Sequence, residues 1–241
     1  MPEFVGYYEV SASRADFKKS GRVMKDAQIH KAMVILTEAV RQWQTPAVTI
    51  VSQREGDPFK VLISCILSLR TQDRTTAAAS ARLFALAGTP AAMAELSVET
   101  VAQAIYPVGF YRTKAVRIGE ICRTLLDHYE GHVPGELDEL LKFKGVGRKT
   151  ANLVVTLGFG KPGICVDTHV HRICNRWGYV RTKTPEQTEF ALRAKLPAEY
   201  WLVINDLLVT FGQNQCHPVS PRCSTCPLRH LCDRVGVVKS R

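Results

Sequence analysis

Four cysteines near the C-terminal end of the sequence are the residues best suited to bind a metal centre. Cys216, Cys223, Cys226 and Cys232 lie within 17 residues, in a segment rich in residues that form turns. Four thiolates can hold tetrahedral zinc, but zinc ribbons usually present two C-x-x-C pairs, and this segment has one. The spacing C-x6-C-x2-C-x5-C therefore favours iron–sulfur ligation, with zinc and unligated core cysteines as the alternatives.

A lysine that could act as a nucleophile follows a turn that contains two glycines. The stretch FKGVGRKTAN places Gly145 and Gly147 around Val146, between two predicted helices. Glycines there permit positive φ and close backbone approach, so the turn, together with Arg148, is a candidate for binding a phosphate. Lys149 falls in the first turn of the second helix, where the helix dipole disfavours the ammonium form and favours a reactive amine. Taken alone, a lysine at such a position is more often an ordinary surface charge.

Helices must position these groups, and helical periodicity covers most of the chain. Ile29, Met33, Leu36 and Val40 recur at steps of three and four, which puts them on one helical face. The run PFKVLISCILSL is apolar nearly all round, as is typical of a buried helix. Asp167 precedes the segment THVHRICNR, where capping alone would explain an aspartate. No run of alternating strand residues and no internal repeat appears, so we predict an all-α fold.

Composition limits the class of protein. The 241 residues carry 32 Lys and Arg against 22 Asp and Glu, a net charge of +10 that suits a polyanionic partner such as nucleic acid. Four of the eight cysteines crowd together while four are scattered in apolar surroundings, which argues against a secreted disulfide framework. No stretch approaches the roughly 18 apolar residues of a membrane span. We therefore expect a cytoplasmic protein without a membrane segment.

Taken together, these motifs resemble the endonuclease III branch of the helix-hairpin-helix DNA glycosylases. That family shares the C-x6-C-x2-C-x5-C spacing, a V-D-T-H aspartate, and the hairpin L-P-G-V-G-R-K-T-A-N, where this chain has Phe143-Lys144 in place of Leu-Pro. The resemblance runs from about residue 28 to residue 233. It implies a [4Fe–4S] cluster on the four cysteines, with Arg222 and Arg229 of the cluster loop on the DNA backbone. It also implies that Asp167 faces Lys149, accepts its proton and stabilises the developing sugar cation.

The resemblance further implies residues that contact DNA around the extruded base. The family usually has L-S-x-Q-x-x-D after the first buried helix, whereas this chain has LSLRTQD. Ser68, Arg70 and Gln72 are the corresponding candidates, with Arg70 carried over by position only. An arginine can still stack in the gap and donate to the widowed base, but the preferred lesion and opposite base stay open.

The implied architecture has two helical lobes. One is a six-helix lobe over 51–161 that contains the helix-hairpin-helix, about 136–158; the other combines 25–50 with 162–241, including the cluster loop 216–232. Residues 1–24 are expected to form a loosely ordered extension. DNA would lie in the groove between the lobes.

The implied function is base-excision repair by a monomeric DNA glycosylase with AP lyase activity. Its partner would be double-stranded DNA of the nucleoid that contains damaged bases, above all oxidised pyrimidines, or abasic sites. One alternative is a monofunctional mismatch glycosylase for adenine or thymine, which normally lacks the lysine. Another is a non-catalytic iron–sulfur protein that binds DNA or transfers electrons.

Overall fold

The structure is a computed structural model that describes residues 24–241 except 44–45, 47, 50 and 52–55. All regular elements within these described residues are helical, which confirms the predicted all-α fold. The predicted extension lies outside them apart from Met24. This residue is 1% exposed and packs in a hydrophobic core, so its side chain belongs to the folded part of the chain. No helix among the described residues has the length and apolar character needed to cross a bilayer.

One group of helices packs around a core that centres on α3 (Pro58–Ser68), in which eight residues are buried. An apolar helix of this kind needs partners on every side, and the surrounding helices supply them. They are α4 (Asp73–Leu86), α5 (Pro90–Ala94), α6 (Val98–Ile105), α7 (Tyr111–Tyr129), α8 (Leu137–Leu141) and α9 (Arg148–Leu153), and α9 continues into a π-helical turn, Val154–Gly158.

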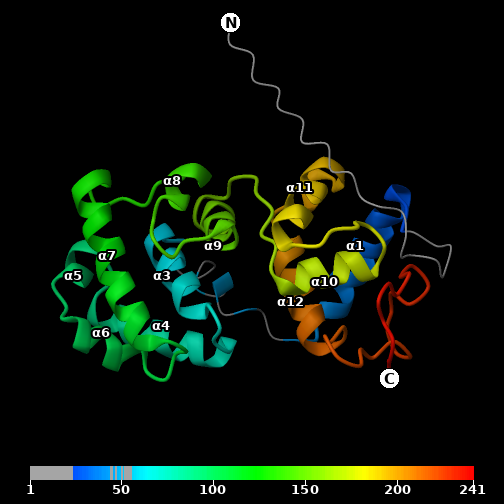
Figure 1. The fold of residues 1–241 in the computed structure, drawn as a ribbon, viewed down its shortest axis with the longest axis horizontal. Coiled ribbons are helices and arrows are strands. Elements are labelled where there is room, and N and C mark those ends of the chain that lie inside the picture. Colours follow the sequence, from blue (N-terminus) through cyan, green and yellow to red (C-terminus); the bar gives the residue numbers. More distant parts are fainter. Residues whose placement is uncertain (1–23, 44–45, 47, 50, 52–55) are drawn as a thin grey trace, which may run out of the picture.

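A second core lies beside the first in Figure 1 and contains both early and late parts of the chain. It joins α1 (Asp26–Val40) to α10 (Thr168–Arg176), α11 (Pro185–Lys195), the 3₁₀ turn Ala198–Tyr200 and α12 (Ile204–Asn214). The predicted face of α1 is confirmed, since Ile29, Met33 and Leu36 are buried. The chain passes from the first group to the second through residues 160–167, which have no regular structure.

Local capping signals set several helix starts. Thr184 accepts a hydrogen bond from the backbone N–H of Gln187 at 3.2 Å, with Pro185 in the first helical position of α11. Asp167 caps α10 in the same manner. The cap at Asp167 was predicted from sequence, because a cap depends only on residues within one turn.

Candidate active site

The turn between α8 and α9 places Lys149 at the second position of α9. Gly145 has φ +86°, a left-handed conformation that favours glycine. Gly147 does not: its φ is −96°, because it forms the extended N-cap of α9. Of the two glycines that permit positive φ, only Gly145 adopts it, and a Cβ added at Gly147 would meet open space.

The amides of this turn are not equally available to an anion. The N–H of Val146 donates to the carbonyl of Phe143 at 3.0 Å, and the Val146 side chain is buried in the first core. The N–H groups of Gly145 and Gly147 find no acceptor within the described part of the chain. The anion-binding capacity of the turn therefore rests on these two amides and the start of α9.

Lys149 is half-buried beside two buried thiols. The Cys165 thiol contacts the carbonyl of Lys149 at 3.6 Å. Burial raises the pKa of Cys65 to about 12 and that of Cys165 well above its usual value, and the positive charge of Lys149 opposes both shifts. Both thiols are therefore neutral at pH 7 and offer Lys149 an apolar lining rather than a counter-ion.

Asp167 is the N-cap residue of α10. One oxygen, Oδ1, accepts from the N–H groups of His169 at 2.8 Å and Val170 at 2.9 Å. Burial lowers the pKa of His169, while the Asp167 carboxylate opposes this shift and the charge of Lys149 adds to it. The charges of Lys149 and Asp167 thus act in opposite directions on the pKa values of buried Cys165 and half-buried His169, and no ion pair joins Lys149 to Asp167 in the described residues.

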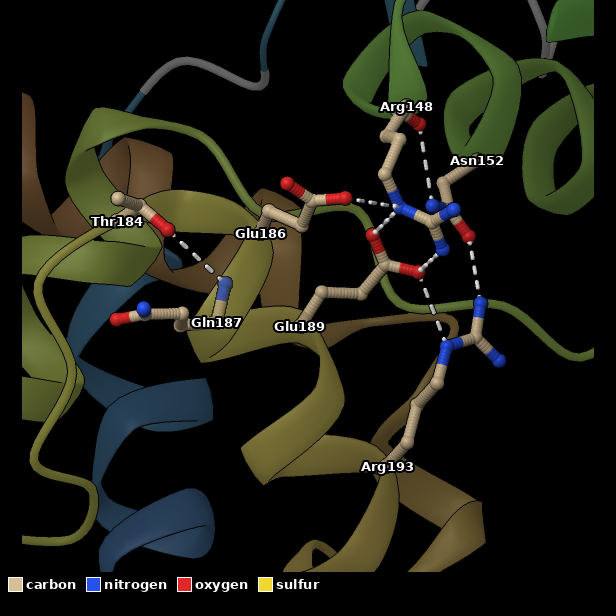
Figure 2. Close-up of polar contacts among 7 residues, drawn as sticks. All are labelled: Arg148, Asn152, Thr184, Glu186, Gln187, Glu189 and Arg193. Carbon is tan, nitrogen blue, oxygen red and sulfur yellow. Dashed lines mark hydrogen bonds and ion pairs between the residues drawn. The ribbon is translucent and has the colours of Figure 1, made fainter. Parts of the chain in front are cut away.

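Arg148 has a buried carboxylate as its partner. Its guanidinium binds both oxygens of Glu189 on α11, with Nη2 to Oε1 at 2.6 Å and Nε to Oε2 at 2.9 Å (Figure 2). The ring of Phe190 lies under the guanidinium, 4.8 Å from centroid to Cζ. Of the hairpin residues predicted to contact DNA, Arg148 therefore already has a strong partner inside the protein.

The segment after α3 presents Arg70 on a strained backbone. Arg70 is exposed with φ +53°, a conformation uncommon for residues other than glycine. Its guanidinium lies 5.5 Å from the ring centroid of Phe110. Ser68 donates to the carbonyl of Cys65 at 2.8 Å, and Gln72 is an exposed N-cap of α4 that makes no side-chain cap bond.

Two residues that sequence reasoning missed support this segment. Lys114 of α7 is 7% exposed and donates to the carbonyls of Leu67 and Leu69, at 2.8 and 2.5 Å. Burial lowers the pKa of Lys114 to about 8. Phe110 is 62% exposed with φ +58°, a combination that no local pattern indicates. A cavity of about 410 Å³ lies between these groups, lined by Ile66, Leu69, Arg70, Phe110, Thr113, Lys114, Arg117 and Gly145.

The four C-terminal cysteines line one cavity of about 20 Å³. Arg176 Nη1 donates to the Cys216 sulfur at 3.3 Å, and the Arg234 N–H donates to the Cys232 sulfur at 3.4 Å. Burial raises the pKa of Cys226 to about 11 and that of Cys232 to about 12, so a bound cation is needed to hold them as thiolates. Four sulfurs around one cavity with N–H donors on them fit an iron–sulfur cluster. In the described residues no three His, Cys, Asp or Glu side chains converge on a single metal ion.

Arginines of α10 hold the cluster loop, which sequence reasoning also missed. Arg176 is 9% exposed and donates to the carbonyls of His217 and Pro218, while Arg172 donates to the carbonyl of Cys216 at 2.8 Å. The two arginines are spaced i, i+4, which places them on one face of the helix. By contrast Arg222 and Arg229 are exposed, and neither forms an ion pair within the described residues.

Sequence comparisons identify what the chain resembles. Residues 63–198 match the model of the HhH-GPD superfamily base excision DNA repair proteins, and residues 216–232 match the iron–sulfur binding domain of endonuclease III. Endonuclease III of Thermotoga maritima is 50% identical over 182 residues, which cover 76% of this chain and 85% of the relative. Endonuclease III of Escherichia coli K12 is 42% identical over 178 residues, covering 74% and 84%.

Solved structures confirm the predicted fold. A trapped endonuclease III–DNA covalent intermediate has a TM-score of 0.78 and 35% identity, and covers 88% of this chain and 97% of its own. A non-covalent endonuclease III–DNA complex gives the same values. A thermostable thymine-DNA glycosylase has a TM-score of 0.74 at 24% identity over 86% and 95% of the two chains, a likeness of fold alone.

Proposed function

The chain belongs to the endonuclease III family of base excision DNA glycosylases with AP lyase activity, and on that premise we propose that Lys149 and Asp167 carry out its reaction. The observation that carries the proposal is the placement of the two groups. Lys149 is the second residue of α9 and Asp167 is the N-cap of α10, and their charges act in opposite directions on the pKa values of Cys165 and His169. This arrangement supports a reaction in which the amine and the carboxylate act on one substrate.

In the proposed reaction the neutral amine of Lys149 attacks C1′ of the damaged nucleotide. A bond forms between Nζ and C1′ while the bond from C1′ to the base nitrogen breaks, and the base leaves with the electron pair and takes up a proton. Asp167 accepts the proton that the amine loses and stabilises positive charge on the sugar. Ring opening gives a Schiff base, loss of a C2′ proton then expels the 3′ phosphate, and water releases the lysine.

The damaged DNA is held by three proposed surfaces. Phosphates meet the amides of Gly145 and Gly147, with the side chain of Val146 anchoring the turn in the core. Ser68, Arg70 and Gln72 border the extruded base, and Arg70 with Phe110 offers a flat cationic and aromatic pair for the gap. Arg222 and Arg229 meet the backbone further along, since both are exposed and neither forms an ion pair with another described residue.

The chain carries a [4Fe–4S] cluster, for which we propose Cys216, Cys223, Cys226 and Cys232 as the ligands. The four cysteines would hold the cluster, which would brace the loop that bears Arg222 and Arg229. Arg176 orients the loop by its bonds to the Cys216 sulfur and to the carbonyls of His217 and Pro218.

The finer parts of the proposal concern substrate and assembly. Oxidised pyrimidines and abasic sites are the proposed substrates, and one chain carries every proposed site residue, which supports action as a monomer. The two cores are proposed to correspond to the two predicted lobes, the lobe with the helix-hairpin-helix (51–161) and the cluster lobe (25–50 with 162–241). The net charge of +10 supports association with nucleoid DNA in the cytoplasm.

Borohydride trapping tests the lyase. Wild type is expected to form a covalent adduct with duplexes that contain thymine glycol, dihydrouracil or an abasic site, and Lys149→Ala is expected to form none. Lys144→Ala is the matched control, because Lys144 is an exposed lysine of the same turn and should still trap at saturating DNA. If wild type trapped on neither lesion nor abasic DNA while releasing a mismatched adenine or thymine, the monofunctional alternative would hold.

A further inference from the structure

Glu189 is a buried carboxylate that the proposed reaction does not use. Its side chain is 3% exposed, yet it lies between two arginines that come from different parts of the fold. Arg148 of α9 binds it through two parallel hydrogen bonds, and Arg193 of its own helix donates from Nε at 3.0 Å (Figure 2). Arg193 also donates to Asn152 Oδ1 at 2.9 Å. The contacts of Glu189 and Arg193 therefore hold α9 at two positions one turn apart, Arg148 and Asn152.

The pair joins the two cores at the start of α9. Arg148 and Glu189 are 41 residues apart in sequence, with α9 in the first core and α11 in the second. A bidentate arginine–carboxylate pair fixes orientation as well as distance. Because Arg148 immediately precedes Lys149, whatever holds its guanidinium also holds the backbone that carries the amine.

Arg148 and Glu189 stabilise each other's charged forms. Burial alone would raise the pKa of Glu189, but hydrogen bonds from Arg148 and Arg193 outweigh it and hold the pKa below its usual value. The Arg148 pKa is raised, first by its hydrogen bond to Glu189. The pair therefore stays ionised at neutral pH, and removing Arg148 takes away the bidentate hydrogen bonds to Glu189 and leaves Arg193 as its arginine partner.

The same contacts argue against a phosphate ligand at Arg148. Its Nε and Nη2 are occupied by Glu189, and its guanidinium stacks on Phe190. A phosphate would have to compete with a carboxylate already bound in the better, bidentate geometry. Glu186, in contrast, lies 4.0 Å from Arg148 Nε with a side chain 64% exposed, and contributes a weak solvent-screened pair.

We infer that Glu189 and Arg148 are positioning residues, which clamp α9 to α11 so that Lys149 is held in line with Asp167. This rests on the proposed role of Lys149. The clamp acts on the geometry of attack rather than on the grip on DNA. Loss of the clamp should therefore slow adduct formation at saturating DNA while leaving affinity and its salt dependence unchanged.

The test measures single-turnover borohydride trapping on abasic DNA, and separately the Kd for a tetrahydrofuran duplex at several salt concentrations. The variants are Glu189→Gln, which keeps the shape but loses the charge, and Arg148→Lys, which keeps the charge but loses the fork. Glu186→Gln is the matched control, since it removes an exposed carboxylate near the same arginine. Arg148→Gln and the Arg148→Gln/Glu189→Gln double variant complete a cycle.

Trapping at saturation is expected to fall on the order of tenfold or more in Glu189→Gln and Arg148→Lys, because displacement of a reacting group by about 1 Å can cost about 100-fold. Glu186→Gln should remain within about twofold of wild type. The double variant should be no slower than the slower single variant, since the two residues act as one unit. Kd and its salt slope should stay at wild-type values in Glu189→Gln and Arg148→Lys.

Two outcomes would overturn the inference. One is trapping by Glu189→Gln and Arg148→Lys at the wild-type rate. The other is a salt slope reduced by about one in Arg148→Gln with its trapping rate unchanged, which would make Arg148 a phosphate ligand. Rates are taken per folded molecule, from circular dichroism and cluster absorbance, and if Glu189→Gln does not fold, Arg148→Lys decides. Failure of wild type to trap would instead refute the role of Lys149, so the two failures are distinguishable.

Discussion

Asp167 has two tasks in the proposal, capping α10 and accepting a proton. One oxygen, Oδ1, accepts both backbone N–H bonds at the start of α10, and Oδ2 forms no hydrogen bond with the described part of the chain. Capping fixes the side chain in place, and a group fixed in advance loses little entropy on reaching the transition state. The capping bonds thus hold in place the carboxylate that the proposed reaction uses as its base.

Asp167→Asn should separate the two tasks. Asparagine caps a helix about as well as aspartate, so the free energy of unfolding should change by less than about 1 kcal/mol. It cannot accept a proton, so glycosylase turnover should fall by about 10²–10⁴. Denaturation and single-turnover base release measure the two effects, with Asp167→Ala as the variant that loses both. Full activity in Asp167→Asn would leave capping as its only task.

Helices α10 and α11 of the second core both contribute residues to the proposed site. From α10 come Asp167 at its start and the arginines that hold the cluster loop near its end, and from α11 comes Glu189. His171 joins the two helices, with Nδ1 2.7 Å from the Thr188 hydroxyl. Burial lowers the pKa of His171, so this helix pair prefers the neutral imidazole.

The stability of this element should therefore fall in mild acid. Below the unfolded pKa of about 6.5, the unfolded chain binds a proton at His171 that the folded chain does not, so the free energy of unfolding decreases as pH falls. His171→Gln should remove up to about one proton from that dependence between pH 6.5 and 5.5. Melting temperatures at pH 7.5, 6.5 and 5.5 measure it. Parallel curves for variant and wild type would contradict the assignment.

Across the whole molecule, some arginines bind groups within the protein and others are exposed to solvent. Arg148, Arg172, Arg176 and Arg193 bind carboxylates, carbonyls or a cysteine sulfur inside the protein. Net charge alone would count them as DNA-binding groups. Arg222 and Arg229 of the cluster loop are exposed, and each phosphate contact that such an arginine makes contributes to the salt dependence of binding.

Affinity for undamaged duplex should therefore fall steeply with salt, and the slope of log K against log salt should weaken by about one in Arg222→Gln and again in Arg229→Gln. Arg41→Gln is the control, because Arg41 is an exposed arginine paired with Glu38 on α1 and has no proposed DNA contact. Fluorescence anisotropy from 50 to 200 mM salt measures the slopes. Slopes equal to that of wild type would remove both arginines from the interface.

The amino-acid sequence by itself determined the features that depend on neighbours along the chain. The apolar face of α1, the buried helix α3 and the cap at Asp167 follow from interactions within a few residues, and the cysteine spacing is likewise a local pattern. The order of the motifs along the chain also indicated the family and its reaction. The hairpin lysine and the four cysteines could be recognised because each motif consists of residues close in sequence.

Only the tertiary structure decided which partners these residues take. Arg148 looks like a DNA contact in its hairpin, but a carboxylate 41 residues away binds it, and Lys114 is tied to the carbonyl of Leu67 47 residues earlier. The sequence of the turn also did not indicate that Gly147 has a negative φ or that the N–H of Val146 donates to the carbonyl of Phe143. Such pairings depend on how the helices pack in the tertiary structure. The spacing of side chains within one helix does not predict which residues of another helix they will contact.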